Sequence, residues 1–577
     1  MNYFLFSQPF RTGTRVVLLL AIVLLNFGYG GTRVAYAAPP VHDNFDAAST
    51  INSIEYHETL NTTEATPSDT VPNVDDPNNI PCEGDTLHAG FASIWYTYTP
   101  PETQSLSLDT IGSDYDTYIA VWTGSRGSLT PVACNDLTSG FYAELSFVAS
   151  AGTQYFIEVA QFNDGQGTTS DIGGTLKFNA YITNTNVRIG GVLKGRYFIP
   201  DSGGLRRSFI NLNDGPVEIF NVAGNQIIAA ERVIYKAQGV NTSFSEMMGL
   251  PNNQLSTTYW LPWYNNVDLD TQLRFGNVSG STATVQVFIG GALMAGSPFT
   301  LNSGESTRLS FPGINNGPVE VRSNVNIVAA ERVIYKIRGI PVSFSEMMGL
   351  PASQLNTTYW LPWYNNVDLD TQLRIGNVSG SPATVTITIG NTPMGGPIQL
   401  PVGGSTRLSF PGINSGPVRI QSNVNIVAAE RVIYKTGAGP VSFSEMMGLP
   451  ASQLNTTYWM PWYNNVGLDT QLRFGNVSAT AATVRVFIAG QEMTGSPFTL
   501  QPGASTRLSF AGIDNGPVRI QSTVNIVAAE RVIYKVNGQP TSFSEMMGLP
   551  NSLLAARYWM PWYNNVDLDT QLRFALP

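Results

Sequence analysis

The stretch SFSEMMGLPNNQLSTTYWLPWYNNVDLDTQLRF, from Ser243 to Phe275, decides the fold, because it returns almost unchanged at Ser343, Ser442 and Ser542. Four copies of one stretch make this chain of 577 residues an array of repeated units. The motif AERVIYK recurs with the same period, at spacings of 100, 99 and 100 residues, and its glutamate is Glu231, Glu331, Glu430 and Glu530. The period is domain-sized, well above the roughly 20 to 50 residues of solenoid repeats.

Short turn sequences such as NVSGS, IGG, NSGE and NNGP divide each unit into strand-length segments. The 55 Gly and 36 Pro of the chain favour strands and tight turns over helices, and 43 % hydrophobic residues are enough for packed cores. Six or seven strands in a unit predict an immunoglobulin-like β-sandwich. The expected strands are Thr271–Phe275, Ala283–Ile289, Ser297–Leu301, Ser306–Phe311, Val319–Ser323 and Ile327–Lys336. The fold class is therefore all-β.

The motif FSEMMGLP and the aromatic run after it are expected to join consecutive sandwiches. Ser243 and Glu246 have capping-box spacing, and Gly249 and Pro251 are placed to end a helix, so the motif predicts one short helical turn. The run Tyr259–Tyr264 contains a proline among aromatic residues and predicts an extended connector.

The repeat boundaries divide the chain into seven segments. They are a signal peptide (1–37), an acidic β-sandwich (38–185), a partial first repeat (186–257), three full repeats (258–357, 358–456 and 457–557) and a truncated final repeat (558–577). Thr183–Asn186 is the expected linker between the acidic domain and the array, because it is polar and has no periodic pattern. The repeats resemble uncharacterised tandem β-sandwich repeats of secreted bacterial surface proteins.

The array opens without the half-unit YWLPWYNNVDLDTQLRF and closes with it, at Tyr558–Phe574. One hypothesis is that this segment completes the first repeat of another molecule, which gives a head-to-tail filament. The favoured alternative is that the true unit begins near Val187, so that the last unit lacks one or two strands and nothing is donated.

The first 37 residues predict an exported protein. Arg11 and Arg15 precede the apolar run Val16–Leu25, and Ala35-Tyr36-Ala37 has the A-x-A form of a cleavage site. The run is shorter than the roughly 20 apolar residues that span a bilayer, so we expect no membrane span after cleavage. An uncleaved N-terminal anchor is the alternative.

Charge is distributed unevenly along the chain. Residues 38–185 contain 19 acidic and 2 basic residues, whereas residues 186–577 contain 22 acidic and 26 basic residues. The acidic front domain would repel phosphate, and the array has no dense basic patch, so nucleic acid is not an expected partner.

The front domain resembles the bacterial pre-peptidase C-terminal (PPC) domain. The segments that carry the resemblance are WYTYTP (95–100), LSLDTIGSDYDTYIAVWTG (106–124), ACND (133–136) and LSFVASAGTQYFIEVA (145–160). The resemblance implies a jelly-roll-like, noncatalytic accessory module of secreted proteins, often attached to proteases. Here the module directly follows the expected signal peptide, and no protease signature accompanies it in the sequence.

Cys82 and Cys134 are the two cysteines of the chain, and an exported protein meets an oxidising environment, so we expect them to form a disulfide. Asp109, Asp114, Asp116 and Asp136 are candidate calcium ligands, because Ca²⁺ prefers carboxylate oxygens. The favoured alternative is that these aspartates cap turns. The PPC family commonly has an acidic residue where this chain has Leu137.

The repeated tryptophans are candidate glycan-binding residues, because exposed aromatic faces stack on sugar rings. The favoured alternative is that they fill the junctions between sandwiches, as large aromatic side chains usually do. The eight residues are Trp260, Trp263, Trp360, Trp363, Trp459, Trp462, Trp559 and Trp562.

His42, His57 and His88 are the histidines of the chain, so the array cannot build a Ser-His-Asp site or a histidine metal centre. We therefore expect a secreted, noncatalytic protein of the cell surface or extracellular matrix, a stalk or adhesin-like array with surface proteins or extracellular polysaccharide as partners. The alternative is a carbohydrate-binding protein that uses the repeated tryptophans. No cofactor is expected apart from the calcium hypothesis.

Overall fold

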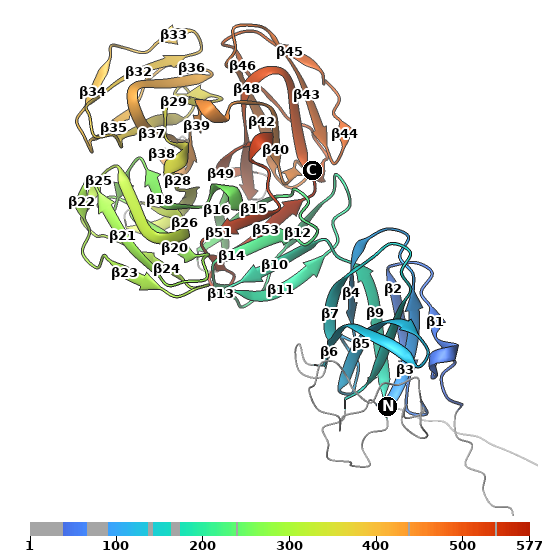
Figure 1. Cartoon of the computed structure of the whole chain (residues 1–577). Coiled ribbons are helices and arrows are strands. Elements are labelled where there is room, and N and C mark those ends of the chain that lie inside the picture. Colours follow the sequence, from blue (N-terminus) through green and yellow to red (C-terminus); the bar gives the residue numbers. More distant parts are fainter. Residues whose placement is uncertain are drawn as a thin grey trace, which may run out of the picture.

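A computed structural model of the chain describes residues 38–65, 91–136, 142–162, 173–237, 240–337, 339–436, 439–536 and 539–577. An N-terminal β-sandwich is followed by four similar β-modules arranged in a closed ring (Figure 1). The predicted all-β class with repeated sandwich-like units is confirmed. The expected signal peptide lies outside the described residues. No helix among the described residues is long and apolar enough to cross a membrane.

The N-terminal sandwich consists of two sheets that enclose one apolar core. One sheet has the strand order β1-β3-β8-β5-β6 and the other β2-β9-β4-β7. The strands are β1 (Ser49–Thr50), β2 (Tyr56–Asn61), β3 (Phe91–Tyr98), β4 (Gln104–Asp109), β5 (Thr117–Ser125), β6 (Ser128–Asn135), β7 (Glu144–Ala149), β8 (Tyr155–Gln161) and β9 (Thr175–Ile182), and a 3-10 turn, η1 (Phe45–Ala47), precedes them. Alternating apolar residues of these strands, such as Leu106 and Leu108, are fully buried between the sheets.

Module 2 shows the plan of every module. Its 19-residue strand β26 belongs to two sheets: the first half pairs with β18 and β21, and the second half pairs with β20 and β27. The strands of module 2 are β18 (Ser256–Leu261), β19 (Tyr264–Asn265), β20 (Asp270–Asn277), β21 (Ala283–Ile289), β22 (Ala292–Leu293), β23 (Phe299–Leu301), β24 (Ser306–Leu309), β25 (Asn315–Asn316), β26 (Val319–Ile337), β27 (Ile340–Met348) and β28 (Leu350–Pro351).

Modules 3 and 4 repeat this plan strand for strand. Module 3 contains β29 (Asn356–Leu361), β30 (Tyr364–Asn365), β31 (Asp370–Asn377), β32 (Ala383–Ile389), β33 (Thr392–Pro393), β34 (Ile398–Leu400), β35 (Ser405–Leu408), β36 (Asn414–Ser415), β37 (Val418–Thr436), β38 (Gly439–Met447) and β39 (Leu449–Pro450). Module 4 contains β40 (Asn455–Met460), β41 (Tyr463–Asn464), β42 (Asp469–Asn476), β43 (Ala482–Ile488), β44 (Gln491–Glu492), β45 (Phe498–Leu500), β46 (Ser505–Leu508), β47 (Asp514–Asn515), β48 (Val518–Val536), β49 (Gln539–Met547) and β50 (Leu549–Pro550).

Module 1 is built from both ends of the array. Its N-terminal part contributes β10 (Thr185–Ile189), β11 (Val192–Tyr197), β12 (Gly204–Arg207), β13 (Asn213–Asp214), β14 (Val217–Asn221), β15 (Ile228–Ala237), β16 (Val240–Met248) and β17 (Leu250–Pro251). Its C-terminal part contributes β51 (Arg557–Met560), β52 (Tyr563–Asn564) and β53 (Asp569–Ala575). Strand β51 pairs with β14 and β17, and β53 pairs with β12 and β15, so the last residues of the array complete its first module.

This closure corrects the favoured expectation that nothing is donated. The segment Tyr558–Phe574 is donated, but to the first module of its own chain, and it occupies the strand edges that the filament hypothesis left vacant. The chain passes from each module to the next once, through the 3-10 turns η2 (Asn252–Gln254), η3 (Ala352–Gln354), η4 (Ala451–Gln453) and η5 (Asn551–Leu553). The modules therefore form a ring and not an extended rod.

The expected helical turn in FSEMMGLP is wrong, because residues 243–248 belong to strand β16 and the 3-10 turn lies further on, at η2. The expected connector at Tyr259–Tyr264 is partly wrong, because residues 259–261 belong to β18, which pairs with β26 and β28. Tyr259 is fully buried, and its hydroxyl donates to the carbonyl of Ile327 at 2.7 Å.

The passage from the sandwich to the ring is shorter than the expected linker. Strand β9 ends at Ile182 and β10 begins at Thr185, so two residues separate them. Thr183 is buried and its hydroxyl bonds to that of Ser107 at 2.8 Å, while Arg196 of the ring forms an ion pair with Glu144 of the sandwich.

Candidate binding site on the ring axis

Four equivalent strands, β16, β27, β38 and β49, surround the axis of the ring and are called here the axial strands. Each pairs on one side with the long strand before it, such as β26 for β27, and turns its other edge toward a neighbouring module. An open strand edge carries unpaired backbone groups. The repeated sequence SFSE of the preceding module supplies a partner for this edge.

Ser243, Ser343, Ser442 and Ser542 form a closed square of hydroxyl groups on the axis. Neighbouring oxygens are 2.8 to 2.9 Å apart around the whole square. A hydroxyl has one proton, so each serine donates one of the four bonds and accepts another. Because the oxygens are in contact, the square leaves no opening for a solute along the axis at this level.

The next residues of the motif tie neighbouring axial strands together. The hydroxyl of Ser245 accepts a hydrogen bond from the backbone amide of Glu346 in the next module at 2.8 Å, and the other three modules repeat this contact. The phenylalanine of the same SFSE motif also crosses to a neighbouring module. The ring of Phe344 packs edge-on against Tyr235 of the preceding module, with centroids 5.5 Å apart. These contacts define the surface between two modules, which we call a seam.

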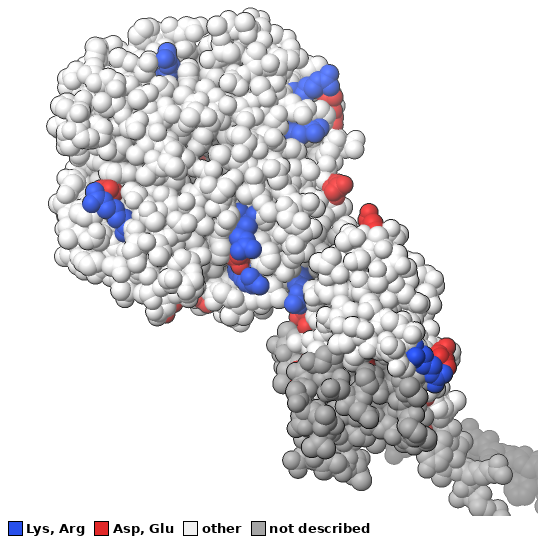
Figure 2. All heavy atoms as spheres, in the orientation of Figure 1, with Lys and Arg blue, Asp and Glu red and all other residues white. Residues whose placement is uncertain are grey.

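Each seam contains a buried arrangement of two arginines and two glutamates. Between modules 1 and 2, Arg332 Nε donates to Glu346 Oε1 at 2.6 Å, and Glu231 and Arg274 lie beside this pair. All four side chains are at most 7 % exposed. The face of the ring in Figure 2 shows few charged groups, which agrees with the burial of these residues in the seams.

Burial shifts the protonation equilibria in the seam. It raises the pKa of Glu231 well above the ordinary 4.5, and the charge of Glu346 raises it further, against the opposing effect of Arg332 and Arg274. Burial also lowers the pKa of Arg274 from its ordinary value to about 9. The same directions hold in the other three seams.

We predict that Glu331→Gln reduces the loss of stability on raising the pH. In the wild-type protein the raised pKa keeps the proton on Glu331 in the folded state, while the unfolded chain ionises above pH 4.5. The free energy of unfolding therefore falls by up to about 1.4 kcal/mol per pH unit for this group, from pH 4.5 to the folded pKa. Urea unfolding between pH 4.5 and 7 measures the effect.

The matched control for this prediction is Asp268→Asn. Asp268 is exposed, and the equivalent residue of module 4 is Gly467. We therefore expect the free energy of unfolding of this variant to depend on pH as it does in the wild type. Equal pH profiles for Glu331→Gln and the wild type would contradict the assignment of Glu331 as a buried group with a raised pKa.

The first tryptophan of each pair packs across a seam. Trp260 packs on the core of module 3, Trp360 on that of module 4, Trp459 within module 1, and Trp559 on that of module 2. Trp459 is 7 % exposed and the other three are half-buried. The indole N–H groups of Trp459 and Trp559 donate to Asn551 and Asn252 at 2.8 and 3.0 Å.

The second tryptophan of each pair lies against an arginine of the next module. The guanidinium of Arg374 lies 5.6 Å from the ring centroid of Trp263, and Arg473 lies 5.4 Å from that of Trp363. Trp562 and Trp462 face Arg274 and Arg206 in the same manner. Each indole N–H also donates to a side-chain oxygen, at 2.6 to 2.8 Å, on Asn315, Asn414, Asp514 or Asn213.

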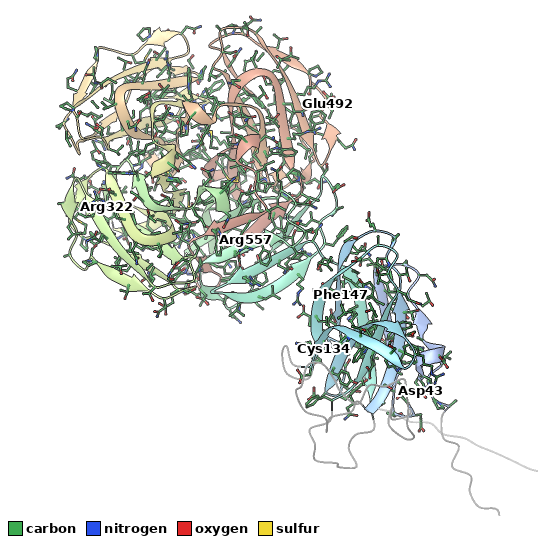
Figure 3. The ribbon with its side chains drawn as sticks, viewed as in Figure 1. Asp43, Cys134, Phe147, Arg322, Glu492 and Arg557 are labelled. Carbon is green, nitrogen blue, oxygen red and sulfur yellow. The ribbon has the colours of Figure 1, made fainter. Side chains whose placement is uncertain are left out.

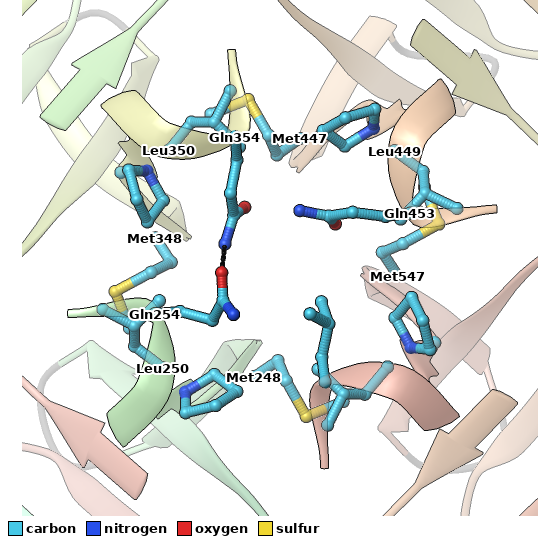
Figure 4. A pocket seen from close by; sticks show the side chains of 18 of the residues that line it. Met248, Leu250, Gln254, Met348, Leu350, Gln354, Met447, Leu449, Gln453 and Met547 are labelled. Atoms are coloured by element: carbon cyan, nitrogen blue, oxygen red, sulfur yellow. Dashed lines mark hydrogen bonds between the residues drawn. The ribbon is translucent and has the colours of Figure 1, made fainter. Parts of the chain in front are cut away.

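The axial strands open at one end into a shallow mouth. Its wall is the sequence Met-Gly-Leu-Pro from every module, and its rim is Gln254, Gln354, Gln453 and Leu553 (Figure 4). The cavity volume of this axial mouth is about 130 Å³. A second cavity of about 90 Å³ shares Met248, Met348, Met447 and Met547 with the mouth and reaches inward to the glutamates of the axial strands.

Glycine is required in the wall because the chain passes close to its neighbours there. A Cβ atom on Gly349 would lie 3.0 Å from the carbonyl oxygen of Ala329 and 3.2 Å from Cβ of Tyr259. The amide of Gly349 donates to that same carbonyl at 2.9 Å. The four mouth segments therefore have the same shape, which places four methionines and three glutamines around one opening.

Two of the four candidate calcium ligands of the sandwich, Asp109 and Asp114, accept hydrogen bonds from other groups of the protein. Asp109 is 4 % exposed and accepts hydrogen bonds from Asn179 and Tyr181 at 2.7 and 2.8 Å, and Asp114 accepts one from the amide of Thr175 at 2.6 Å. Asp136 follows β6, and Asp116 precedes β5. Within the described part of the chain, no group of three or more His, Cys, Asp or Glu residues has an arrangement suited to a metal ion.

Cys134 lies on β6 of the sandwich (Figure 3). Its sulfur is disulfide-bonded. Cys82 lies outside the described residues.

The axial mouth itself was not predicted from the sequence. The available signal was that the sequence SFSEMMGLP is identical in all four copies, although turns such as NVSGS and NVSAT differ.

Comparison with known proteins identifies no family. No family model and no curated protein matches the chain. Among solved structures, a glycoside hydrolase family 32 protein from Bifidobacterium adolescentis is 9 % identical, with 83 % of this chain and 97 % of that chain covered and a TM-score of 0.17. The M60 catalytic domain with the CBM51-1 and CBM51-2 domains from Clostridium perfringens ZmpB is 9 % identical, with 80 % of this chain and 55 % of that chain covered and a TM-score of 0.13. Such scores carry no argument about fold or activity.

Proposed function

We propose that the protein is a secreted, noncatalytic binding protein of the cell surface or extracellular matrix. In this proposal the ring presents one ligand site, the axial mouth, and the N-terminal sandwich is an accessory module of the PPC-like type. The observation that carries the proposal is that all four modules place half-buried apolar side chains around a single opening. Concave sites lined by apolar groups with a few polar groups are the usual form of ligand sites.

Export is supported by the leader-like sequence of residues 1–37 and by the disulfide-bonded state of Cys134, because disulfides persist in oxidising compartments. A noncatalytic role is supported by the chemistry of the seams. Their glutamates face arginines and are buried, so they are placed to hold modules together and not to meet a substrate.

The proposal is tested by the binding of the labelled mature protein to arrays of extracellular peptides and glycans. We expect a signal that is lost in the variant Met348→Trp, because the larger side chain fills the mouth, and that is kept in Asp268→Asn, which changes an exposed loop. Absence of any binding, or hydrolysis of an arrayed peptide or glycan, would contradict the proposal.

The alternative, carbohydrate binding by the repeated tryptophans, leads to a separate prediction. Trp363 donates its N–H to Asn414 at 2.7 Å and faces Arg473 across a seam, so Trp363→Ala should lower the free energy of unfolding by about 3 kcal/mol. We expect the same for Trp263→Ala, with no loss of glycan signal in either variant while it remains folded. Loss of a glycan signal in folded Trp363→Ala protein, measured on the same array, would instead support the alternative.

A further inference from the structure

The size of the axial mouth limits what it can hold. Its volume of about 130 Å³ is close to that of an engineered apolar cavity of about 150 Å³ that binds benzene. One aromatic ring or one leucine-sized side chain therefore fills it. Behind the methionines, the second cavity of about 90 Å³ gives their flexible side chains room to move when the mouth is filled.

The wall of the mouth favours an uncharged, apolar group. Its lining contains methionine, glycine, leucine, proline and glutamine, with no charged residue. Methionine adapts to differently shaped apolar groups and makes favourable contacts with aromatic rings through sulfur. A charged group placed in this wall would lose its hydration without gaining a partner.

The rim of the mouth is suited to amide groups. Gln354 Nε2 donates to Gln254 Oε1 at 2.5 Å, and Figure 4 shows these two side chains and that of Gln453 pointing into the opening. Within the described chain, the carboxamide of Gln453 has no hydrogen-bond partner. A carboxamide donates and accepts as a peptide group does, so it can bond a peptide backbone in both directions.

We propose that the axial mouth binds a peptide segment of a partner protein through one large apolar side chain. That side chain, aromatic or leucine-like, enters the methionine and leucine wall, and the carboxamides of Gln254, Gln354 and Gln453 hold the peptide groups beside it. This inference rests on the proposed binding function and names the chemistry of its ligand.

The fourth rim position provides a matched test, because Leu553 stands where the other modules have glutamine. Leu553→Gln should tighten the binding of an amide-bearing ligand, and Gln453→Leu should weaken it, each by about twofold to tenfold, the effect of one hydrogen bond.

The experiment uses the full mature chain with ¹³C-labelled methionine methyl groups, titrated with N-acetyl-phenylalaninamide and observed by NMR. We expect shifts at Met248, Met348, Met447 and Met547, with a dissociation constant on the order of 1 mM. N-acetyl-lysinamide and N-acetylglucosamine, titrated in parallel, should cause no shift at these methionines.

Two NMR results would overturn the inference: no shift at these methionines with the phenylalanine probe, or equal shifts with the lysine or sugar probe. Array binding that survives Met348→Trp would also overturn it, while leaving a binding function at another surface. Shifts at the methionines without any array signal would support the chemistry of the mouth and contradict the extracellular binding function.

Discussion

Removal of residues 557–577 is expected to unfold the first module and to open the ring. The deleted strands β51, β52 and β53 supply Tyr558, Met560, Tyr563, Leu572 and Phe574 to the core of module 1, and all five side chains are fully buried. Truncation of one such side chain costs about 2 to 5 kcal/mol, so the loss of all five costs about 10 to 25 kcal/mol. This is comparable to or larger than the roughly 5 to 15 kcal/mol by which a native protein is stable.

Size-exclusion chromatography with light scattering and urea unfolding measure this effect. The full-length protein should be a monomer whose unfolding midpoint does not depend on concentration, because the donated segment belongs to the same chain. The deletion should expose the edges of β14 and β15 and associate as concentration rises. A synthetic peptide of residues 557–577 should restore the monomer by adding the missing strands.

Single substitutions separate ring closure from the general cost of a lost core residue. Phe574→Ala in the donated strand and Phe474→Ala at the equivalent position of module 4 should each cost about 3 to 5 kcal/mol. A deletion variant that remains monomeric and as stable as the full chain would contradict closure by the C-terminal segment. Oligomers of the full-length protein that disappear on deletion would support the filament hypothesis instead.

Breaking one buried ion pair of a seam should cause the second largest loss in the free energy of unfolding. Arg332 and Glu346 are 7 % and 5 % exposed, and Arg332 approaches Glu346 Oε1 through both Nε and Nη2. Arg332→Met leaves the carboxylate of Glu346 buried without this partner, which costs about 3 to 5 kcal/mol. In the double variant Arg332→Met and Glu346→Leu most of this loss should be recovered, because both charges are removed together.

The same strand contains the control for this prediction. Arg322 (Figure 3) pairs with Glu320 on β26 at the same distance of 2.6 Å, but its side chain is 53 % exposed. Arg322→Met should therefore cost less than about 1 kcal/mol. The role of the seam pair would be refuted if urea unfolding gave equal losses for Arg322→Met and Arg332→Met, or no recovery in the double variant.

The sequence was sufficient to predict strands and units, because turn chemistry and periodicity are local. The predicted segments Ala283–Ile289 and Thr271–Phe275 lie within β21 and β20, and the segments Val319–Ser323 and Ile327–Lys336 are two halves of β26. Their continuity was not predicted, because the intervening residues Asn324 to Asn326 look like a turn, whereas tertiary pairing on both sides keeps them extended.

The helical turn was predicted in FSEMMGLP because Ser243 and Glu246 fit a local capping pattern. In the structure these side chains bond outside their own segment: Ser243 to serines of two other modules, and Glu246 to Arg232. A local pattern cannot reveal partners about 100 or 300 residues away. The axial mouth was not found for the same reason, since each module contributes only a quarter of its wall.

The two interpretations of the tryptophans could be weighed from the sequence but not decided. The sequence shows aromatic residues beside a proline, which suits either a sugar platform or a packed junction. The arginines that face the indole rings, such as Arg374 for Trp263, lie in the following repeat, and only the ring geometry brings them together.

The closed square of Ser243, Ser343, Ser442 and Ser542 has a consequence for how this gene could change. Near-identical repeats readily gain or lose a copy by recombination, and a linear array of independent domains tolerates this. In the ring each module turns the chain through one quarter of a circle, and both edges of every module are occupied by its neighbours. A gain or loss of one repeat would no longer bring the donated C-terminal strands back to the first module at the angle that their pairing requires. Selection for folding should therefore hold the number of modules at four.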